Sequence, residues 1–309
     1  MATEPVLAAF QLNALQRRHS VRSHVLSDYW GLTKPEVNFL IAMTTVAAFC
    51  LGSPKPFVHF PWLLLLHTLL GTVLVASGAG ALNQLIERKF DAHMRRTSRR
   101  PIAVGRVEPI HALIFGSLLS LAGTIYLALA VRPAASLLAL LTLCAYLFLY
   151  TPLKRRTPWC TLVGAFPGAM PVLIGYVAAT GKLDAEAWQL YAILFLWQFP
   201  HFMAIAWMYR EDYARAGYRV LPNGAEQTRF MGWQTVLPAL ALVSVAFAPM
   251  ALRHANPVFE TGTLLLSLGF LYFAARLAWI RSSQAARCLL LVSILYLPLV
   301  FLLVVLAKA

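Results

Sequence analysis

The sequence has few charged residues and few cysteines, and both shortages narrow the possible classes of protein. Only 12% of its 309 residues are Asp, Glu, Lys or Arg, whereas a soluble domain carries about 25%. Cys50, Cys144, Cys160 and Cys288 form no C-x-x-C pair, which argues against a zinc site or c-type haem attachment and indicates packing residues. No apolar core precedes the first basic residues, so we expect no secretory signal peptide.

Long apolar runs take the place of charge. Hydrophobic residues make up 60% of the chain, and the runs approach the ~20 residues that a membrane-spanning helix needs. They lie near 36–53, 60–83, 108–130, 134–151, 161–180, 188–209, 232–252, 259–279 and 287–307. Short connections and the lack of a soluble or repeated segment predict an all-α polytopic membrane protein. We expect nine transmembrane helices in a single domain over 1–309, with a short cytoplasmic N-terminal tail over 1–34.

The basic residues are distributed unevenly between the connections. Most of the 26 lysines and arginines lie in the N-terminal tail and in the connections after the second, fourth, sixth and eighth runs. The other connections hold only Lys55, Arg132, Lys182, Arg253 and Lys308. The positive-inside rule therefore predicts a cytoplasmic N-terminus and, with an odd number of helices, a C-terminus on the opposite side. A bacterial inner membrane is the simplest location, and the net charge of +14 then needs no nucleic-acid partner.

The most informative polar stretch follows the second run and reads NQLIERKFDAHMRRTSRRP at 83–101. Its Asn83, Glu87 and Asp91 are four residues apart and therefore share one helix face. Carboxylates at the end of a membrane helix are costly and usually functional, and Arg96 and Arg100 follow them. We therefore predict that this ladder binds a divalent metal that holds a polyanion, for which the hard oxygen ligands favour Mg²⁺.

A second acidic cluster follows the sixth run on the same side of the membrane, at Glu211 and Asp212 beside Tyr213. Two interpretations are open. The two carboxylates converge with the ladder on one metal site, or they form a solvated helix end, where charge is routine. The ladder favours the first interpretation.

A basic run and a histidine complete the set of candidate residues. Between Pro152 and Pro158 the chain carries Lys154, Arg155 and Arg156. These side chains suit phosphates and carboxylates, although a topological anchor would look the same. His201 follows Pro200 inside an apolar run. It either caps the carbonyl that the proline frees or contacts substrate, and we favour the contact because ionisable residues inside a membrane are usually functional.

These motifs resemble those of the UbiA superfamily of membrane prenyltransferases, and in particular of its branch that farnesylates haem. The family pattern N-x-x-x-D-x-x-x-D-x-x-M-x-R-T-x-x-R-P is similar to residues 83–101, with Glu87 in place of the first Asp. The pattern around K-R-R-T-P-W is similar to Tyr150–Trp159, one residue shorter here, and W-x-x-P-H-F is similar to Trp197–Phe202. The pattern D-Y-x-x-A-G-I-P-M-L-P is similar to 212–222, where Tyr218, Arg219 and Val220 stand in place of I-P-M.

The resemblance implies a fold, a reaction and roles for the candidate residues. It implies nine helices around a central cavity, in which farnesyl diphosphate, water and the vinyl group of haem B give haem O and diphosphate. Implied to bind Mg²⁺ are Asn83, Glu87, Asp91 and Asp212. Implied to bind the substrates are Arg96, Arg100, Lys154, Arg155, Arg156, His201, Glu211 and Tyr213, of which the basic run would hold the haem propionates.

Two other functions stay open at this stage. One is a prenyltransferase of the same superfamily with an aromatic, quinone-precursor acceptor. The other is a transporter of an anionic lipid or metabolite, which could gather the same charges at its mouth. The partners we expect are farnesyl diphosphate, haem B and the lipid bilayer, and no pattern identifies an oxidase-assembly or haem-handling protein.

Overall fold

A computed structural model describes residues 25–53, 59–222, 224, 226–252 and 257–308. Within these ranges, nine helical spans are long and apolar enough to cross a membrane. Eight of them are the helices α2 (Pro35–Gly52), α3 (Trp62–Asp91), α4 (Pro109–Ala130), α7 (Cys160–Thr180), α8 (Ala185–Met208), α10 (Glu226–Leu252), α11 (Pro257–Ile280) and α12 (Ser283–Lys308). The remaining span joins α5 (Pro133–Cys144), a π-helical turn (Ala145–Tyr150) and α6 (Thr151–Leu153), and a short helix α9 (Arg210–Arg215) follows α8.

The prediction of an all-α, multi-pass membrane protein with nine spans is confirmed. Each predicted run falls largely within one of the observed spans. The second helix is longer than its apolar run, because it continues to Asp91 and carries the whole polar ladder. The predicted tail is described only from residue 25 onward, so Arg17, Arg18 and Arg22 lie outside the described residues, as do Lys55 and Arg253.

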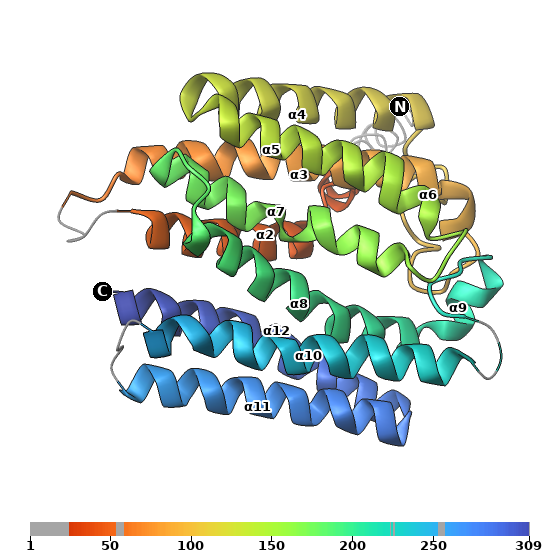
Figure 1. Ribbon diagram of the computed structural model, residues 1–309. Helices are drawn as coiled ribbons and strands as arrows, with labels where there is room; N and C mark the ends of the chain where they lie inside the picture. The colour runs from red at the N-terminus through yellow and green to blue at the C-terminus, as the bar shows by residue number, and fades with distance from the viewer. Residues whose placement is uncertain (1–24, 54–58, 223, 225, 253–256, 309) are drawn as a thin grey trace, which may run out of the picture.

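The helices form layers around α7 and α8 (Figure 1). Helices α3, α4 and α5 lie on one side, α10, α11 and α12 lie on the other, and α2, α7 and α8 lie between them. Leu173 of α7 and Met203 of α8 are fully buried. By contrast, outer helices expose large apolar side chains such as Leu129 and Trp279, which is the arrangement expected of lipid-facing surfaces.

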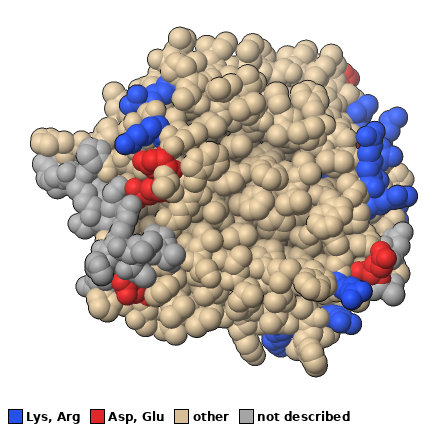
Figure 2. All heavy atoms as spheres, in the orientation of Figure 1, with Lys and Arg blue, Asp and Glu red and all other residues tan. Residues whose placement is uncertain are grey.

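Charged residues gather at the two ends of the bundle. Figure 2 shows Lys, Arg, Asp and Glu at both edges of the molecule, with an uncharged band across the helices between them. Because charge inside the hydrocarbon region is costly, this band marks the part of the surface that faces lipid.

Local sequence features place the helix ends. Pro35, Pro109 and Pro133 occupy the first turns of α2, α4 and α5, where the missing N–H costs no hydrogen bond. Asp184 caps α8 by accepting hydrogen bonds from two backbone N–H groups. The Thr151 hydroxyl, just after the π-helical turn, donates to the Tyr146 carbonyl within that turn at 2.8 Å, and π-helical turns often occur at functional sites.

Candidate functional site

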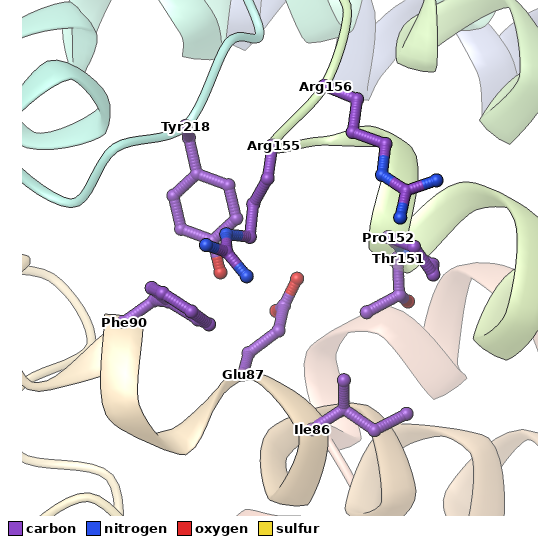
Figure 3. Close-up of a pocket in the computed structure, with 8 residues that line it drawn as sticks. All are labelled: Ile86, Glu87, Phe90, Thr151, Pro152, Arg155, Arg156 and Tyr218. Carbon is purple, nitrogen blue, oxygen red and sulfur yellow. The ribbon is translucent and has the colours of Figure 1, made fainter.

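An apolar cavity of about 440 Å³ opens beside the end of α3. Its walls come from α2, α3, α5, α7, α8 and α12, and include Val37, Ile41, Val75, Leu143, Leu194 and Leu297. Its polar end is lined by Lys34, Asn83, Glu87, Asp91, Arg96, Arg100 and Lys154. Figure 3 shows a second cavity, of about 400 Å³, and Glu87 lines both cavities.

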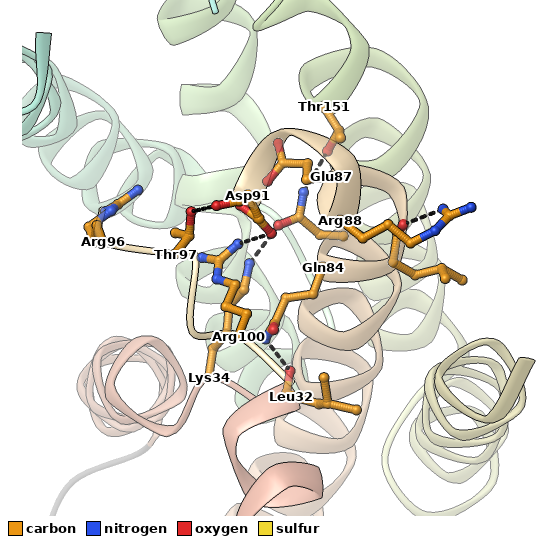
Figure 4. Close-up of polar contacts among 12 residues, drawn as sticks. Leu32, Lys34, Gln84, Glu87, Arg88, Asp91, Arg96, Thr97, Arg100 and Thr151 are labelled. Atoms are coloured by element: carbon orange, nitrogen blue, oxygen red, sulfur yellow. Dashed lines mark hydrogen bonds and ion pairs between the residues drawn. The ribbon is translucent and has the colours of Figure 1, made fainter. Parts of the chain in front are cut away.

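Each rung of the polar ladder meets one cationic side chain. Figure 4 shows Lys34 and Arg100 among these cations. The three contacts are Lys34 Nζ to Asn83 Oδ1 at 2.6 Å, Lys154 Nζ to Glu87 Oε1 at 2.8 Å, and Arg100 Nη1 to Asp91 Oδ2 at 2.7 Å. All three rungs are buried. The predicted i, i+4 spacing therefore places the three rungs on one face of α3. A row of cations lies opposite that face.

Asp91 has one carboxylate oxygen with no hydrogen-bond partner among the described residues. The side chain is 1% exposed, and Oδ1 is the oxygen without a partner. Thr97 donates to the backbone carbonyl of the same residue at 3.0 Å, which fixes the turn after α3. A buried carboxylate oxygen without a hydrogen-bond partner is costly. Oδ1 of Asp91 is therefore a candidate ligand atom for a bound group.

Lys34 belongs to the site, although its position in the sequence suggested only a topological charge. Its φ of 54° is left-handed, a strained conformation for a residue with a side chain. Gln84 donates to the Leu32 carbonyl at 3.2 Å and Asn38 donates to the Thr33 carbonyl at 2.9 Å, and both bonds hold the segment before α2. Lys34, which we expected in the tail, therefore lines the cavity.

The two lysines of the site differ in how their surroundings affect the ammonium group. Burial lowers the pKa of Lys34, and nearby Arg100 lowers it further. Burial also acts to lower the pKa of Lys154, but Glu87 and Tyr150 outweigh it and hold that pKa well above the ordinary value. Lys154 is thus the more firmly charged of the two.

The basic run is divided between the two cavities. Lys154 lines the larger cavity through its bond to Glu87, whereas Arg155 and Arg156 line the smaller one. The Arg155 guanidinium lies 4.0 Å from the centre of the Phe90 ring, and among the described residues neither arginine forms an ion pair with a carboxylate. The three basic residues that we predict to bind substrate therefore lie at two different cavities.

Tyr218, which the sequence marked only as a departure from the family pattern, is a further residue of the site. It is 6% exposed, and its hydroxyl has no hydrogen-bond partner among the described residues. Figure 3 shows Tyr218, Arg155 and Glu87 pointing toward one another. Burial raises the pKa of the Tyr218 phenol and Glu87 raises it further, so the hydroxyl keeps its proton and stays a donor.

The segment that departs from the family pattern forms a backbone contact. The Arg219 N–H donates to the Lys154 carbonyl at 2.7 Å and so joins the connection after α9 to the basic run. A proline at this position would have no N–H to donate. The hydrogen bond from Arg219, which stands where the family pattern has proline, therefore joins the two connections that cover the polar end of the cavity.

Arg96 also faces the cavity, from the turn after α3. Its guanidinium lies 5.2 Å from the Tyr209 ring centre, and Nη2 lies 3.4 Å from the Tyr213 hydroxyl. Tyr213 lines the same cavity. This contact joins the turn after α3 to α9.

Glu211 and Asp212 lie apart from the ladder, contrary to the expectation that they converge with it. Neither lines either of the two cavities described above. The Glu211 side chain is 81% exposed and lies 3.6 Å from Arg210, while Asp212 Oδ1 lies 2.6 Å from Arg215 on the next turn of α9. The described residues contain no group of three or more Asp, Glu, His or Cys side chains that could together hold a metal ion. Each of the two carboxylates is thus paired with an arginine of its own helix, α9.

His201 lines the larger cavity, deeper in the membrane span than the ladder. Helix α8 continues through Pro200, and the histidine does not cap a freed carbonyl through Nδ1. That nitrogen lies 2.7 Å from Ser293 Oγ of α12, and the ring stacks on Trp197 with 4.6 Å between centroids. His67, a further histidine within a membrane-spanning helix, lies with Nδ1 2.6 Å from the Tyr126 hydroxyl and so joins α3 to α4.

Fold and site together define a multi-pass membrane protein with an apolar cavity that ends in paired carboxylates and cations. The model of the UbiA prenyltransferase family matches residues 41–305. The chain therefore belongs to the UbiA prenyltransferase family.

Comparison with individual proteins agrees with this family. The chain is 47% identical, over 89% of its length and 97% of the other chain, to "Protoheme IX farnesyltransferase" of Solibacter usitatus, and 40% identical, over 90% and 92%, to the protein of that name from Koribacter versatilis. A structure of digeranylgeranylglyceryl phosphate synthase has a TM-score of 0.72 at 16% identity, covering 91% of this chain and 98% of that one. A UbiA homologue from Archaeoglobus fulgidus bound to GPP and Mg²⁺ has a TM-score of 0.63 at 13% identity, covering 90% and 99%. These solved structures share the fold.

Proposed function

We propose that the protein transfers a farnesyl group from farnesyl diphosphate, with addition of water, to a vinyl group of haem B, giving haem O and diphosphate. The observation that carries the proposal is the cavity itself, in which three oxygen-bearing rungs with three cations close one end of an apolar chamber. A polyanion with an apolar tail fits this division. Relatives named for haem farnesylation, similar over most of the chain, support the choice of acceptor.

The ladder fits Mg²⁺. Its ligands are carboxylate and amide oxygens, which this ion prefers, and the unpartnered Oδ1 of Asp91 supplies an oxygen that the protein leaves free. Asn83, Glu87 and Asp91 would hold the ion. Bound there, it would offset the charge of the diphosphate leaving group.

The cations of the polar end would receive the diphosphate. Among the described residues, the Arg96 guanidinium contacts Tyr209 and Tyr213 and forms no ion pair, so it is available for phosphate oxygens. Lys34, Lys154 and Arg100 already meet ladder oxygens and would share them with the metal and the phosphates. As the allylic carbon–oxygen bond breaks, its electron pair leaves with diphosphate, whose added charge these groups stabilise.

The apolar walls would protect the allylic cation until the acceptor reaches it. The vinyl π electrons then form the new carbon–carbon bond, and water adds its oxygen to the carbon next to the porphyrin and loses a proton. The smaller cavity supports carboxylate binding at Arg155 and Arg156, with the Tyr218 hydroxyl as a further donor. We assign the haem propionates to this cavity.

The end of the bundle that carries the ladder would face the cytoplasm of a bacterial inner membrane, with the C-terminus on the opposite side. The charge distribution of the connections supports this orientation.

The acceptor is tested by offering purified protein radiolabelled farnesyl diphosphate and Mg²⁺ with either haem B or 4-hydroxybenzoate. Label is expected in the haem fraction alone. Label on 4-hydroxybenzoate would favour an aromatic acceptor. Movement of either compound across vesicle membranes, with no labelled product, would instead indicate a transporter.

A further inference from the structure

The hydroxyl of Ser293 determines which nitrogen of His201 can act in the cavity. Ser293 is fully buried on α12, and its Oγ donates to the Leu290 carbonyl at 2.6 Å. A carbonyl only accepts hydrogen bonds, so the single hydroxyl proton lies in this bond. The contact at 2.7 Å between Ser293 Oγ and His201 Nδ1 must then use a proton on Nδ1. The neutral imidazole consequently has an unprotonated Nε2.

The second ring nitrogen is open to the cavity. His201 lines the cavity wall. Among the described residues Nε2 has no hydrogen-bond partner, and it is not among the enclosed polar atoms that lack one. Its lone pair is therefore accessible to a molecule in the chamber. An accessible, neutral imidazole nitrogen is a good ligand for a transition metal such as iron.

Ser293 also fixes the plane of the ring. Its backbone carbonyl accepts a hydrogen bond from Trp197 Nε1 at 2.9 Å, and Trp197 stacks on His201. One residue of α12 thus anchors two neighbouring rings of α8, one through the backbone and one through the side chain. A substitution at Ser293 can therefore remove the hydroxyl that contacts His201 and keep the backbone carbonyl that holds Trp197, which allows the two contacts to be tested separately.

We propose that Ser293 is a positioning residue that holds His201 with Nε2 unprotonated and directed into the cavity, where it is an axial ligand of the haem iron. This inference rests on the proposed function, since it concerns the acceptor of that reaction. It assigns Ser293 an effect on haem binding and none on the binding of farnesyl diphosphate.

The test compares Ser293→Ala with Ser293→Thr, which keeps a hydroxyl. The control is Ser267→Ala, which removes another buried hydroxyl that pairs α11 with α12, through Tyr296 at 3.0 Å. The measurements are the absorption spectrum of added haem B and the KM values for both substrates. Ser293→Ala is expected to shift the haem spectrum and raise the KM for haem about threefold to tenfold, the effect of one lost hydrogen bond. Ser293→Thr and Ser267→Ala are expected to resemble the wild type in both measurements.

Removal of the ligand itself provides the second measurement. His201→Ala should lose the axial-ligand spectrum, and added imidazole should restore it. This measurement applies even if Ser293→Ala does not fold.

Provided that the wild type forms farnesylated haem, two results would overturn the inference. One is an unchanged haem spectrum and haem KM in Ser293→Ala, and the other is an unchanged spectrum in His201→Ala. A wild-type protein that forms no farnesylated haem at all would instead contradict the proposed function.

Discussion

At the residue scale, the site combines buried carboxylates with cations that the chain supplies from three separate segments. Lys34 comes from the turn before α2, Arg100 from the connection after α3, and Lys154 from the end of α6. A buried charge that loses its partner is strongly destabilising. Substitution of the carboxylate and substitution of the cation in each pair should therefore have different effects on the free energy of unfolding and on the rate of catalysis.

Asp91 should be essential for turnover. Asp91→Asn keeps the shape of the side chain and removes its charge, so we expect activity to fall more than about a hundredfold, in line with the loss of a group that stabilises developing charge. The matched control is Asp28→Asn, which removes another buried carboxylate, paired with Arg106 at 2.9 Å and outside both cavities. Haem O formation by the two variants, at equal amounts in the membrane, is the measurement. Near-normal product from Asp91→Asn would remove this residue from the metal site.

Arg96 and Arg100 should separate substrate binding from stability. Arg96→Ala should raise the KM for farnesyl diphosphate about tenfold to a hundredfold, the value of a charge-assisted bond to phosphate, with little change in thermal stability. Arg100→Ala should have a similar effect on KM and also destabilise the protein by about 3 kcal/mol, because Asp91 loses its ion-pair partner.

The control for both arginines is Arg95→Ala, since Arg95 is exposed and lines neither cavity. Steady-state kinetics and thermal unfolding in the same detergent give the two quantities. If Arg96→Ala weakened the response to haem and left the response to farnesyl diphosphate unchanged, the assignment of Arg96 to phosphate would be incorrect.

At the element scale, the segment before α2 matters because it brings a cation to the first rung of the ladder in a left-handed conformation. Glycine adopts this conformation without the cost that a side chain imposes, about 1 kcal/mol. Lys34→Gly should therefore unfold at a higher temperature than Lys34→Ala, while both lose activity because both lack the ammonium group. Equal activity of Lys34→Gly and the wild type would show that the ammonium group is not needed.

Local pattern was enough to predict the spans and the ladder, and tertiary placement decided the rest. Asn83, Glu87 and Asp91 share a face because helical periodicity alone puts them there. The apolar run near 60–83 ended before the helix did, because the polar rungs of α3 interrupt hydropathy without interrupting the helix. Contacts between distant segments leave no local pattern, so Lys34 was read only as a topological charge and Ser293 was not selected. Asp212 was expected at the ladder for a different reason, because its ion pair with Arg215, three residues further along α9, was not considered.

At the scale of the whole molecule, the asymmetry of charge between the two ends gives a testable orientation. A reporter that is active only in the cytoplasm should be inactive when fused to the C-terminus, and one that requires export should be active there. The same pair of reporters placed after residue 224, in the connection before α10, should give the opposite pattern, because that connection lies at the ladder end. Cytoplasmic activity at the C-terminus would contradict nine spans with the N-terminus inside.

The central claim is that this cavity joins farnesyl to haem and that water supplies the new hydroxyl oxygen. Mass spectrometry of haem, extracted after incubation with farnesyl diphosphate, Mg²⁺ and water labelled with heavy oxygen, tests it most directly. The account predicts a haem heavier by one farnesyl group and one labelled hydroxyl in the wild type, and unmodified haem with Asp91→Asn. Unmodified haem in the wild type, or farnesylated haem without the label, would contradict the account.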